Sequence, residues 1–372
     1  MRLTLLLILA VAALLARQPF VEKIDLFEAG KDGYATYRIP GIVVTRKGTV
    51  LAYTEARQSA RGDWGPIDIF LRRSTDGGQS FQARQRIASV AGPHRKNPVA
   101  LAQNLANPDD RTYNNPVAIA DRNGAVHFLF CLEYMRAFYM RSDDDGRTFS
   151  KPVEITAAFE QFRKDYDWKV LATGPGHSIQ LRNGRLIVPV WLSLGTGSHA
   201  HRPSVNSVIY SDDHGATWHR GDIAVPDTQE FVFPNETVAA QLPDGRVMLN
   251  VRSESKARRR ILTYSKDGAT GWSAPVFHPQ LLEPICMASM ISVGRLLVFS
   301  NPDMPTSERR NVTIKLSYDE GKTWPVSRAL EQGPSGYSDL AAAGDGIILC
   351  LYERANRFLT LARFNQEWVK EE

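Results

Sequence analysis

The stretch SDDDGRTF, residues Ser142–Phe149, carries the turn motif that organises this chain, Ser-x-Asp-x-Gly-x-x-aromatic. In such a turn the Asp carboxylate can accept hydrogen bonds from nearby backbone N–H groups, and Gly tolerates a positive φ. The aromatic side chain can pack beneath the turn. We therefore interpret the motif as structural rather than catalytic. Other copies are Ser74–Phe81, Ser211–Trp218 and Ser317–Trp324, and a degenerate copy, Ser265–Trp272, has Ala269 where Gly is expected.

A second repeated signal is a Gly-containing turn between two apolar runs, as in SIQLRNGRLIVPV around Gly184. This pattern is typical of a β-hairpin. One inner hairpin followed by one outer hairpin makes a four-stranded sheet, and six such units predict an all-β, six-bladed β-propeller. The six hairpin turns centre on Gly48, Gly124, Gly184, Gly245, Gly294 and Gly346.

The sixth unit lacks the Asp-containing motif, which leaves its outer edge open. We expect the ring to close by pairing the segment Phe20–Phe27 with Phe358–Phe364, because this pairing removes the open edge. No Gly/Ser linker or change of composition interrupts the chain, so residues 18–372 are predicted to form one domain. Helical periodicity is scarce, and a helix of one or two turns is expected only within Val153–Phe162.

The N-terminus has the layout of a secretory signal. Arg2 precedes an apolar stretch from Leu3 to Ala16, interrupted only by Thr4, and Arg17 follows it. This stretch is too short to span a bilayer comfortably, so residues 1–17 are predicted to be a signal peptide. The alternative is an uncleaved membrane anchor. In the first case the protein is secreted or periplasmic, with no stable membrane insertion after cleavage.

The charged and metal-binding residues argue against several other classes. The formal net charge is +5, but Lys and Arg are scattered except in the run Lys256–Arg260, which we expect to be an exposed loop rather than a nucleic-acid site. The pair His199 and His201 lacks a nearby third ligand, so no metal is expected. Cys131, Cys286 and Cys350 allow at most one disulfide and match no zinc spacing.

Polar residues are predicted to converge at one end of the propeller axis. Counting back eight to ten residues from each turn glycine reaches the far end of the innermost strand, and counting forward seven to nine returns to the same rim along the antiparallel partner. Unpaired charges in a narrow funnel are costly, so their convergence indicates a ligand site. These positions hold Arg38, Asn115, Gly176, His177, Glu236, Cys286, Met287 and Tyr337 on the inner strands, and Arg57 and Arg252 on their partners.

Four elements together carry a family resemblance: Tyr37-Arg38-Ile39-Pro40, the complete turn motifs, Asp63-x-Gly65-x-Ile67-Asp68, and Gly336-Tyr337-Ser338. The chain resembles the bacterial exo-α-sialidases (neuraminidases) of the six-bladed Asp-box, or BNR-repeat, family. The resemblance covers nearly all of the chain after the signal. It implies a retaining exo-α-sialidase that hydrolyses terminal α-linked sialic acid from glycoconjugates, without a cofactor.

The resemblance also implies roles for basic residues. Sialidases hold the carboxylate on the anomeric carbon with three arginines, whose fork-shaped, permanently charged groups suit this task. Arg38 and Arg252 match the first two. Arg309 or Arg310 matches the third, and Arg309 is preferred because the family pattern places Asn two residues later, where Asn311 stands. Arg57 is expected to contact the side of the sugar that bears the 4-hydroxyl.

The implied catalytic residues are Tyr337, Glu236 and Asp63. Tyr337 would be the nucleophile, and Glu236 its base, because a phenol with a pKa near 10 needs one. Asp63 would protonate the leaving group, which requires a raised pKa. Asp68 is its rival, although its place at the start of a strand favours a structural role. Trp64 either covers the sugar or packs in its loop.

One departure from the family pattern keeps other substrates open. Asn115 stands before Pro116 where an Asp is expected, which keeps hydrogen bonding but removes a negative charge near the substrate. The alternatives are a glycosidase for a related 2-keto-3-deoxy sugar acid, Kdn or Kdo, and a noncatalytic sialic-acid-binding propeller. The loop with His199 and His201 would line the glycerol or aglycone side.

Overall fold

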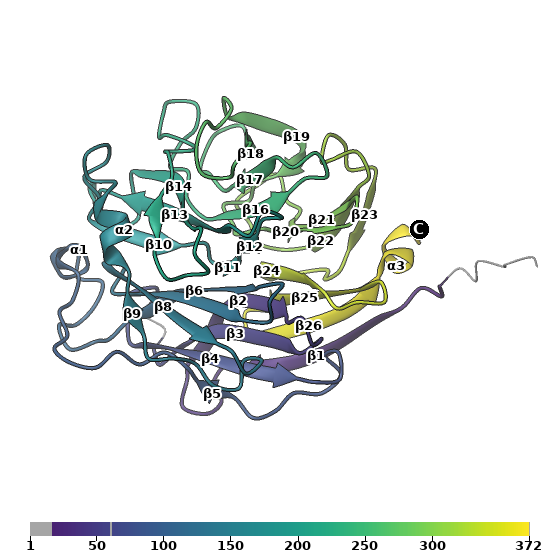
Figure 1. Ribbon diagram of the computed structural model, residues 1–372, viewed down its shortest axis with the longest axis horizontal. Helices are drawn as coiled ribbons and strands as arrows, with labels where there is room; N and C mark the ends of the chain where they lie inside the picture. The colour runs from purple at the N-terminus through teal and green to yellow at the C-terminus, as the bar shows by residue number, and fades with distance from the viewer. Residues whose placement is uncertain (1–16, 60–61, 372) are drawn as a thin grey trace, which may run out of the picture.

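The computed structural model describes residues 17–59 and 62–371, and in this part of the chain six antiparallel sheets surround a common axis (Figure 1). The all-β, six-bladed prediction is confirmed. The innermost strands β2, β6, β16, β20 and β24 lie nearest the centre of the view in Figure 1. Blade 1 contains β2 (Thr36–Val44), β3 (Val50–Arg57), β4 (Ile67–Ser74) and β5 (Gln85–Arg86), and blade 2 contains β6 (Tyr113–Ala120), β7 (Val126–Leu132), β8 (Arg136–Ser142) and β9 (Val153–Glu154).

The remaining blades follow in chain order. Blade 3 contains β10 (Val170–Thr173), β12 (Ile179–Gln180), β13 (Leu186–Ser193), β14 (Ser204–Ser211) and β15 (His219–Arg220), and blade 4 contains β16 (Thr237–Gln241), β17 (Val247–Val251), β18 (Arg259–Ser265) and β19 (Val276–Leu282). Blade 5 contains β20 (Ser289–Val293), β21 (Leu296–Pro302), β22 (Val312–Ser317) and β23 (Val326–Ala329), and blade 6 contains β24 (Ser335–Ala342), β25 (Ile347–Arg354), β26 (Phe358–Asn365) and β1 (Val21–Glu28).

The two ends of the chain close the ring within blade 6. Strand β1 pairs antiparallel with β26, with Val21 opposite Phe364 and Glu28 opposite Phe358. The predicted closure is therefore confirmed. The edge that the sixth unit would expose is covered by the first strand of the same chain.

Blade 3 differs from the predicted repeat. Its inner strand is interrupted after β10 by the cis peptide Gly174–Pro175, and the short strand β11 (Gly176–His177) pairs in parallel with β6 of blade 2. Strand β12 then resumes the pairing with β13. Counting along a regular hairpin cannot detect this interruption, so the predicted position of His177 at the rim is displaced.

The Asp-containing motifs form the turns that their sequence predicts. In the copy that begins at Ser142, Asp144 accepts hydrogen bonds from the N–H groups of Arg147 at 3.0 Å and Thr148 at 2.9 Å, and the Ser142 hydroxyl accepts from Gly146 N–H at 2.9 Å. In the degenerate copy, Gly268 takes the glycine position one residue early, with φ of 74° and its N–H 3.0 Å from the Ser265 hydroxyl. The turn therefore tolerates Ala269.

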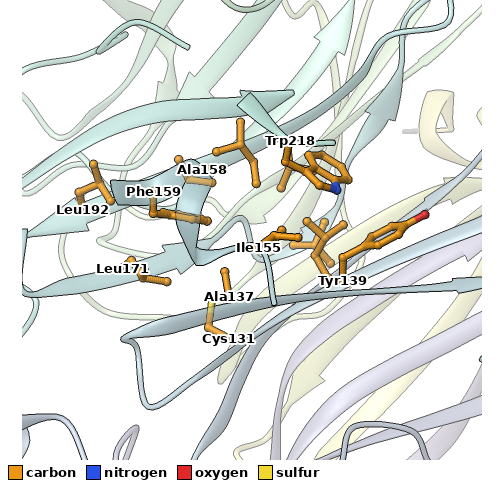
Figure 2. Packing of buried hydrophobic residues seen from close by; sticks show 14 of the residues in the cluster. Cys131, Ala137, Tyr139, Ile155, Ala158, Phe159, Leu171, Leu192 and Trp218 are labelled. Atoms are coloured by element: carbon orange, nitrogen blue, oxygen red, sulfur yellow. The ribbon is translucent and has the colours of Figure 1, made fainter. Parts of the chain in front are cut away.

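The core lies between neighbouring blades. The second strands β3, β7, β13 and β17 are buried along their whole length, because a blade flanks each face. Figure 2 shows the cluster between blades 2 and 3, to which blade 2 contributes Cys131 and Tyr139 and blade 3 contributes Leu171 and Leu192. Phe159 fills the same space from α2 (Thr156–Glu160), a short helix inside the segment predicted to contain one.

The described residues contain two further short helices, α1 (Pro98–Ala102) and α3 (Gln366–Lys370). No helix among these residues has the length and apolar character needed to cross a membrane. The predicted signal peptide, residues 1–17, lies outside the described residues except for Arg17.

Candidate active site

One pocket gathers the predicted site residues at the far ends of the inner strands. All residues with a predicted catalytic or substrate-binding role except Arg57 line it, whereas the other predicted rim residues, Gly176, His177, Cys286 and Met287, do not. The residues around it are Arg38, Ile39, Asp63, Asn115, Tyr134, Trp191, His199, His201, Arg202, Asn235, Glu236, Arg252, Glu254, Arg309 and Tyr337.

Tyr337, Glu236 and Arg252 form the centre of the pocket. The Tyr337 hydroxyl lies 2.8 Å from each carboxylate oxygen of Glu236, and Arg252 donates to the Tyr337 hydroxyl at 2.8 Å and to Glu236. Tyr337 is 5% exposed. Burial raises the pKa of its phenol well above the ordinary value, although the charge of Arg252 opposes this. The phenol is therefore neutral, and the Glu236 carboxylate lies within hydrogen-bond distance of its proton.

Two more arginines flank the Tyr337 ring. The guanidinium groups of Arg38 and Arg309 each lie 5.1 Å from the ring centroid. Arg38 is held by Glu353, whose carboxylate accepts from Nε at 3.0 Å and Nη2 at 3.3 Å and also from the N–H groups of Ile39 and Tyr337, both at 3.2 Å. Glu353 thus fixes the cation and the phenol together.

Arg309 and Arg310 point to different surroundings. Arg309 lines the pocket and donates to the carbonyl of Ile285 at 2.7 Å. The Arg310 side chain is 42% exposed and pairs with Glu308 at 3.3 Å. Only Arg309 can therefore contact a ligand that occupies the pocket.

Asp63 sits beside Arg57 at the pocket wall. Its Oδ1 lies 2.8 Å from Arg57 Nη1, and its side chain keeps 40% exposure. The raised pKa that the role of acid requires is not present in this arrangement. Burial favours the neutral acid, but the charges of Arg57, His201 and Arg38 outweigh it and lower the pKa of Asp63 far below the ordinary value. Asp63 is therefore ionised here.

Arg57 itself lies behind the pocket wall. It is 2% exposed, and its Nε and Nη2 donate to the Glu55 carboxylate at 3.1 and 2.8 Å. Its contact in the pocket is Asp63, so it reaches a ligand through that residue.

Asn115 is fixed in the pocket wall beside Glu55. Its Nδ2 donates to the carbonyl of Thr173 at 3.0 Å, and its Oδ1 accepts from Asn114 at 3.2 Å. Its backbone adopts a φ of 51°, and its N–H donates to Glu55 at 2.9 Å. The side chain is thus held in place, with the amide replacing a charge in the pocket wall.

Several residues singled out in the sequence lie elsewhere. His177 binds Asp339 in the channel at 2.7 Å, and Cys286 is a buried thiol whose pKa is raised by burial to about 12. Trp64 is 4% exposed and packs on Tyr134, with ring centroids 4.5 Å apart, so it does not cover the pocket. Asp68 bonds to the Tyr34 hydroxyl at 2.7 Å outside the site.

The sequence predicts that the basic run Lys256–Arg260 is an exposed loop. This prediction is wrong for Arg260. Arg260 is fully buried, with Nη1 2.5 Å from Glu283 and Nε 2.6 Å from Asn250. Its position on β18 turns it inward, and the charge is neutralised inside blade 4. The histidines His199 and His201 do line the pocket, but in the described part of the chain no group of three His, Cys, Asp or Glu side chains could hold a metal ion.

The site also contains residues that the sequence analysis missed. Glu55 and Glu353 stand seven residues after the turn glycines Gly48 and Gly346, as Arg252 does after Gly245. The count along the second strand could therefore have found them. The same count reaches Trp191, seven residues after Gly184, and Glu254, nine residues after Gly245. Tyr134 and Arg202, which pairs with Glu254 at 2.6 Å, carry no comparable sequence signal.

The chain is similar to known sialidases over most of its length. It is 30% identical over 385 residues to the "Sialidase" of Micromonospora viridifaciens, covering 95% of this chain and 55% of that protein. It is 33% identical over 359 residues to the "Sialidase" of Bacteroides fragilis (strain YCH46), covering 89% of this chain and 62% of that protein. The chain thus spans little more than half the length of these two curated relatives.

Solved structures agree with the sequence comparison. The "Hadza microbial sialidase Hz136" superposes with a TM-score of 0.79 at 30% identity, over 93% of this chain and 69% of that one. The resemblance to sialidases found in the sequence is therefore confirmed. The BNR repeat-like domain family matches residues 101–350, most of the propeller, and the chain belongs to this family.

Proposed function

We propose that this protein is a retaining exo-α-sialidase that releases terminal α-linked sialic acid from glycoconjugates. The observation that carries the proposal is the buried Tyr337 phenol bonded to Glu236 within a pocket whose lining includes Arg38, Arg252 and Arg309. A pocket that only binds a sugar acid needs the cations but has no use for a neutral phenol paired with a base. The names of the relatives support the same reaction.

The three arginines Arg38, Arg252 and Arg309 would bind the carboxylate of the sugar. Each remains a cation at any working pH, and guanidinium groups bind carboxylates through paired, charge-assisted hydrogen bonds. Both Arg38 and Arg309 flank the Tyr337 ring, and Arg252 touches its hydroxyl. A carboxylate held by this cluster brings the adjacent anomeric carbon close to the phenolic oxygen.

In the first step the Tyr337 oxygen attacks the anomeric carbon while its proton passes to Glu236. The bond to the aglycone breaks, and Asp63 supplies the proton that the departing oxygen takes. A neutral phenol suits this attack, because a carboxylate nucleophile would be repelled by the carboxylate on the same carbon. The ionised Asp63 must therefore gain a proton before this step, and a substrate carboxylate among the arginines would reduce the positive charge that opposes it.

In the second step Asp63 takes a proton from water, and the water oxygen attacks the anomeric carbon. The Tyr337 oxygen leaves and recovers its proton from Glu236. Two displacements at one carbon retain its configuration. Arg57 would orient Asp63 through their 2.8 Å contact, on the side of the sugar that bears the 4-hydroxyl.

Release of 4-methylumbelliferone from the ketosides of sialic acid, Kdn and Kdo tests the activity and its substrate. We expect the sialic acid ketoside to react fastest. Asn115 supports the alternative of Kdn or Kdo, because its amide lacks the negative charge expected at that wall. Faster release from the Kdn or Kdo ketoside would select that alternative, and no release from any of the three would favour a noncatalytic binding protein.

We also propose that residues 1–17 are a signal peptide, that residues 18–372 form the catalytic domain, and that the protein acts on sialylated glycans outside the cytoplasm. The layout of Arg2 and the apolar stretch up to Ala16 supports export. N-terminal sequencing of the protein from the culture medium or periplasm would test this. An N-terminus at Met1 would contradict it.

A further inference from the structure

Glu55 shares an arginine with the proposed acid. Arg57 donates from Nε and Nη2 to Glu55 Oε2 at 3.1 and 2.8 Å, and its Nη1 lies 2.8 Å from Asp63 Oδ1. One guanidinium therefore serves two carboxyl groups. Glu55 is fully buried behind the wall, whereas Asp63 faces the pocket.

The hydrogen bonds around Glu55 are those of a carboxylate. Its Oε1 accepts from the N–H of Asn115 at 2.9 Å, so each of its bonds comes from a donor and none requires a proton on Glu55. Burial raises the pKa of Glu55, while Arg57 and the Asn115 N–H oppose the increase. Burial outweighs these two, so the pKa stays raised, but donors occupy both carboxylate oxygens, which is the hydrogen bonding of the charged form.

The charged and titratable groups around the pair come from four parts of the fold. Arg57 on β3 and Arg38 on β2 act on Asp63, together with His201 from the loop after β13 and Tyr134 after β7. Cys131 on β7 and Tyr134 lie near Glu55. Burial lowers the pKa of His201 to about 4, so the imidazole is neutral at higher pH and the arginines are the standing cations.

We propose that Glu55 is a positioning residue that sets the acid strength of Asp63 through Arg57. It neutralises part of the Arg57 charge and holds two of its donors, so that less of the guanidinium is left to stabilise ionised Asp63. Without this buried anion, Arg57 would hold Asp63 as a carboxylate more strongly and the acid would lose its proton at lower pH. The inference rests on the proposed function, because it requires Asp63 to be the acid.

The variant Glu55→Gln tests this. Gln keeps the size and an oxygen for the Asn115 N–H but has no charge. On 3′-sialyllactose, whose sugar leaving group needs a proton, the alkaline limb of kcat, which reports the acid in the enzyme–substrate complex, should move to lower pH by about one unit, the lower end of the shift caused by one nearby charge. On the 4-methylumbelliferyl ketoside the limb should hardly move.

Glu353→Gln is the matched control, because Glu353 is also a carboxylate buried behind an arginine, Arg38. It should raise KM for both substrates alike and should move the 3′-sialyllactose limb less than Glu55→Gln does, because Arg38 lowers the pKa of Asp63 less than Arg57 does. Thermal melting must first show that each variant is folded. If Glu55→Gln does not fold, Glu55→Asp withdraws the charge by one methylene and should move the same limb in the same direction by less.

An alkaline limb on 3′-sialyllactose that stays in place in the folded variant would overturn the inference. So would an equal shift on both substrates, because such a shift would not depend on the acid. Failure of the proposed function has a different result: the wild-type protein would then release no sugar from any ketoside, before a pH profile is measured.

Discussion

The hydroxyl of Tyr337 lies 2.8 Å from both carboxylate oxygens of Glu236, although the two residues are 101 positions apart and belong to blades 6 and 4. The propeller brings them together because the start of β24 and the segment just before β16 lie at the same rim. Burial raises the pKa of the phenol, so it would not ionise at neutral pH without a base. In the proposed mechanism Glu236 is that base.

Tyr337→Phe should abolish normal turnover while binding survives. The variant removes one hydroxyl and leaves the three arginines in place, so the fold and the affinity for 2-deoxy-2,3-didehydro sialic acid should be kept. This flattened analogue resembles the transition state and retains the carboxylate. The measurements are kcat on the 4-methylumbelliferyl ketoside and the Kd by calorimetry.

Tyr264→Phe is the matched control, because Tyr264 is a partly buried tyrosine of β18 far from the pocket lining. It should keep full activity. Unchanged turnover in Tyr337→Phe would remove Tyr337 from the role of nucleophile.

Asp63→Ala should lose far more activity on 3′-sialyllactose than on the 4-methylumbelliferyl ketoside. A phenolate leaves with little protonation, whereas a sugar alkoxide needs a full proton. The comparison of kcat/KM for the two substrates in wild type and variant measures the difference. An equal fractional loss on both would mean that Asp63 only shapes its loop.

Arg309→Ala and Arg310→Ala should separate the two neighbouring arginines. Arg309 lines the pocket, and its loss should weaken binding of the didehydro analogue by about 1.5 to 3 kcal/mol, the scale of a charge-assisted hydrogen bond. Arg310 pairs with Glu308 at the surface, so its loss should change the Kd little. Calorimetry on both variants decides, and the reverse order of the two effects would assign the third arginine to Arg310.

Asp339 joins four strands across the propeller axis. Its Oδ1 lies 2.7 Å from Nδ1 of His177 and accepts from the Ser289 hydroxyl at 2.8 Å, while its Oδ2 accepts from the N–H of Ile42 at 2.8 Å. Burial opposes a charge on His177, but Asp339 outweighs it and raises the pKa of the imidazole. His177 therefore holds its proton more tightly in the folded protein than in the unfolded chain.

This raised pKa predicts that stability falls with rising pH. The His177 contribution is fully present below the unfolded pKa of about 6.5 and is lost as pH rises through the higher folded pKa, with about 1.4 kcal/mol at stake for each pKa unit. Urea unfolding at pH 6 and pH 9 should show a larger decrease for wild type than for His177→Gln. The same decrease in both proteins would contradict the ion pair.

The sequence predicts the blades well because their signals are local. The turn glycines and the Ser142–Phe149 type of motif each determine a turn within eight residues, and the closure by β1 follows from the open edge that the sixth unit leaves. Blade 3 could not be predicted in detail, because the pairing of β11 with β6 depends on a neighbouring blade.

The site shows the same division. Arg38, Glu236 and Tyr337 could be placed from their distance to a turn glycine, because a count of eight to ten residues reaches the far end of the inner strand even though the pairing register shifts after Arg38 and around Tyr337. The lowered pKa of Asp63 could not be predicted, because it arises from Arg57, Arg38 and His201, which come from different strands and loops. Burial of Arg260 was likewise invisible, since its partners Asn250 and Glu283 flank it only after folding.

The central claim is that Tyr337 forms a covalent bond to the anomeric carbon. The most direct measurement is mass spectrometry of peptides after incubation with 2,3-difluoro sialic acid, whose fluorine at C3 slows the second step while fluoride at C2 leaves readily. The account predicts that the peptide containing Tyr337 gains the mass of one 3-fluorosialyl group, and that Tyr337→Phe gains none. A label on Glu236 or Asp63, or an active wild-type enzyme that gains no label, would contradict it.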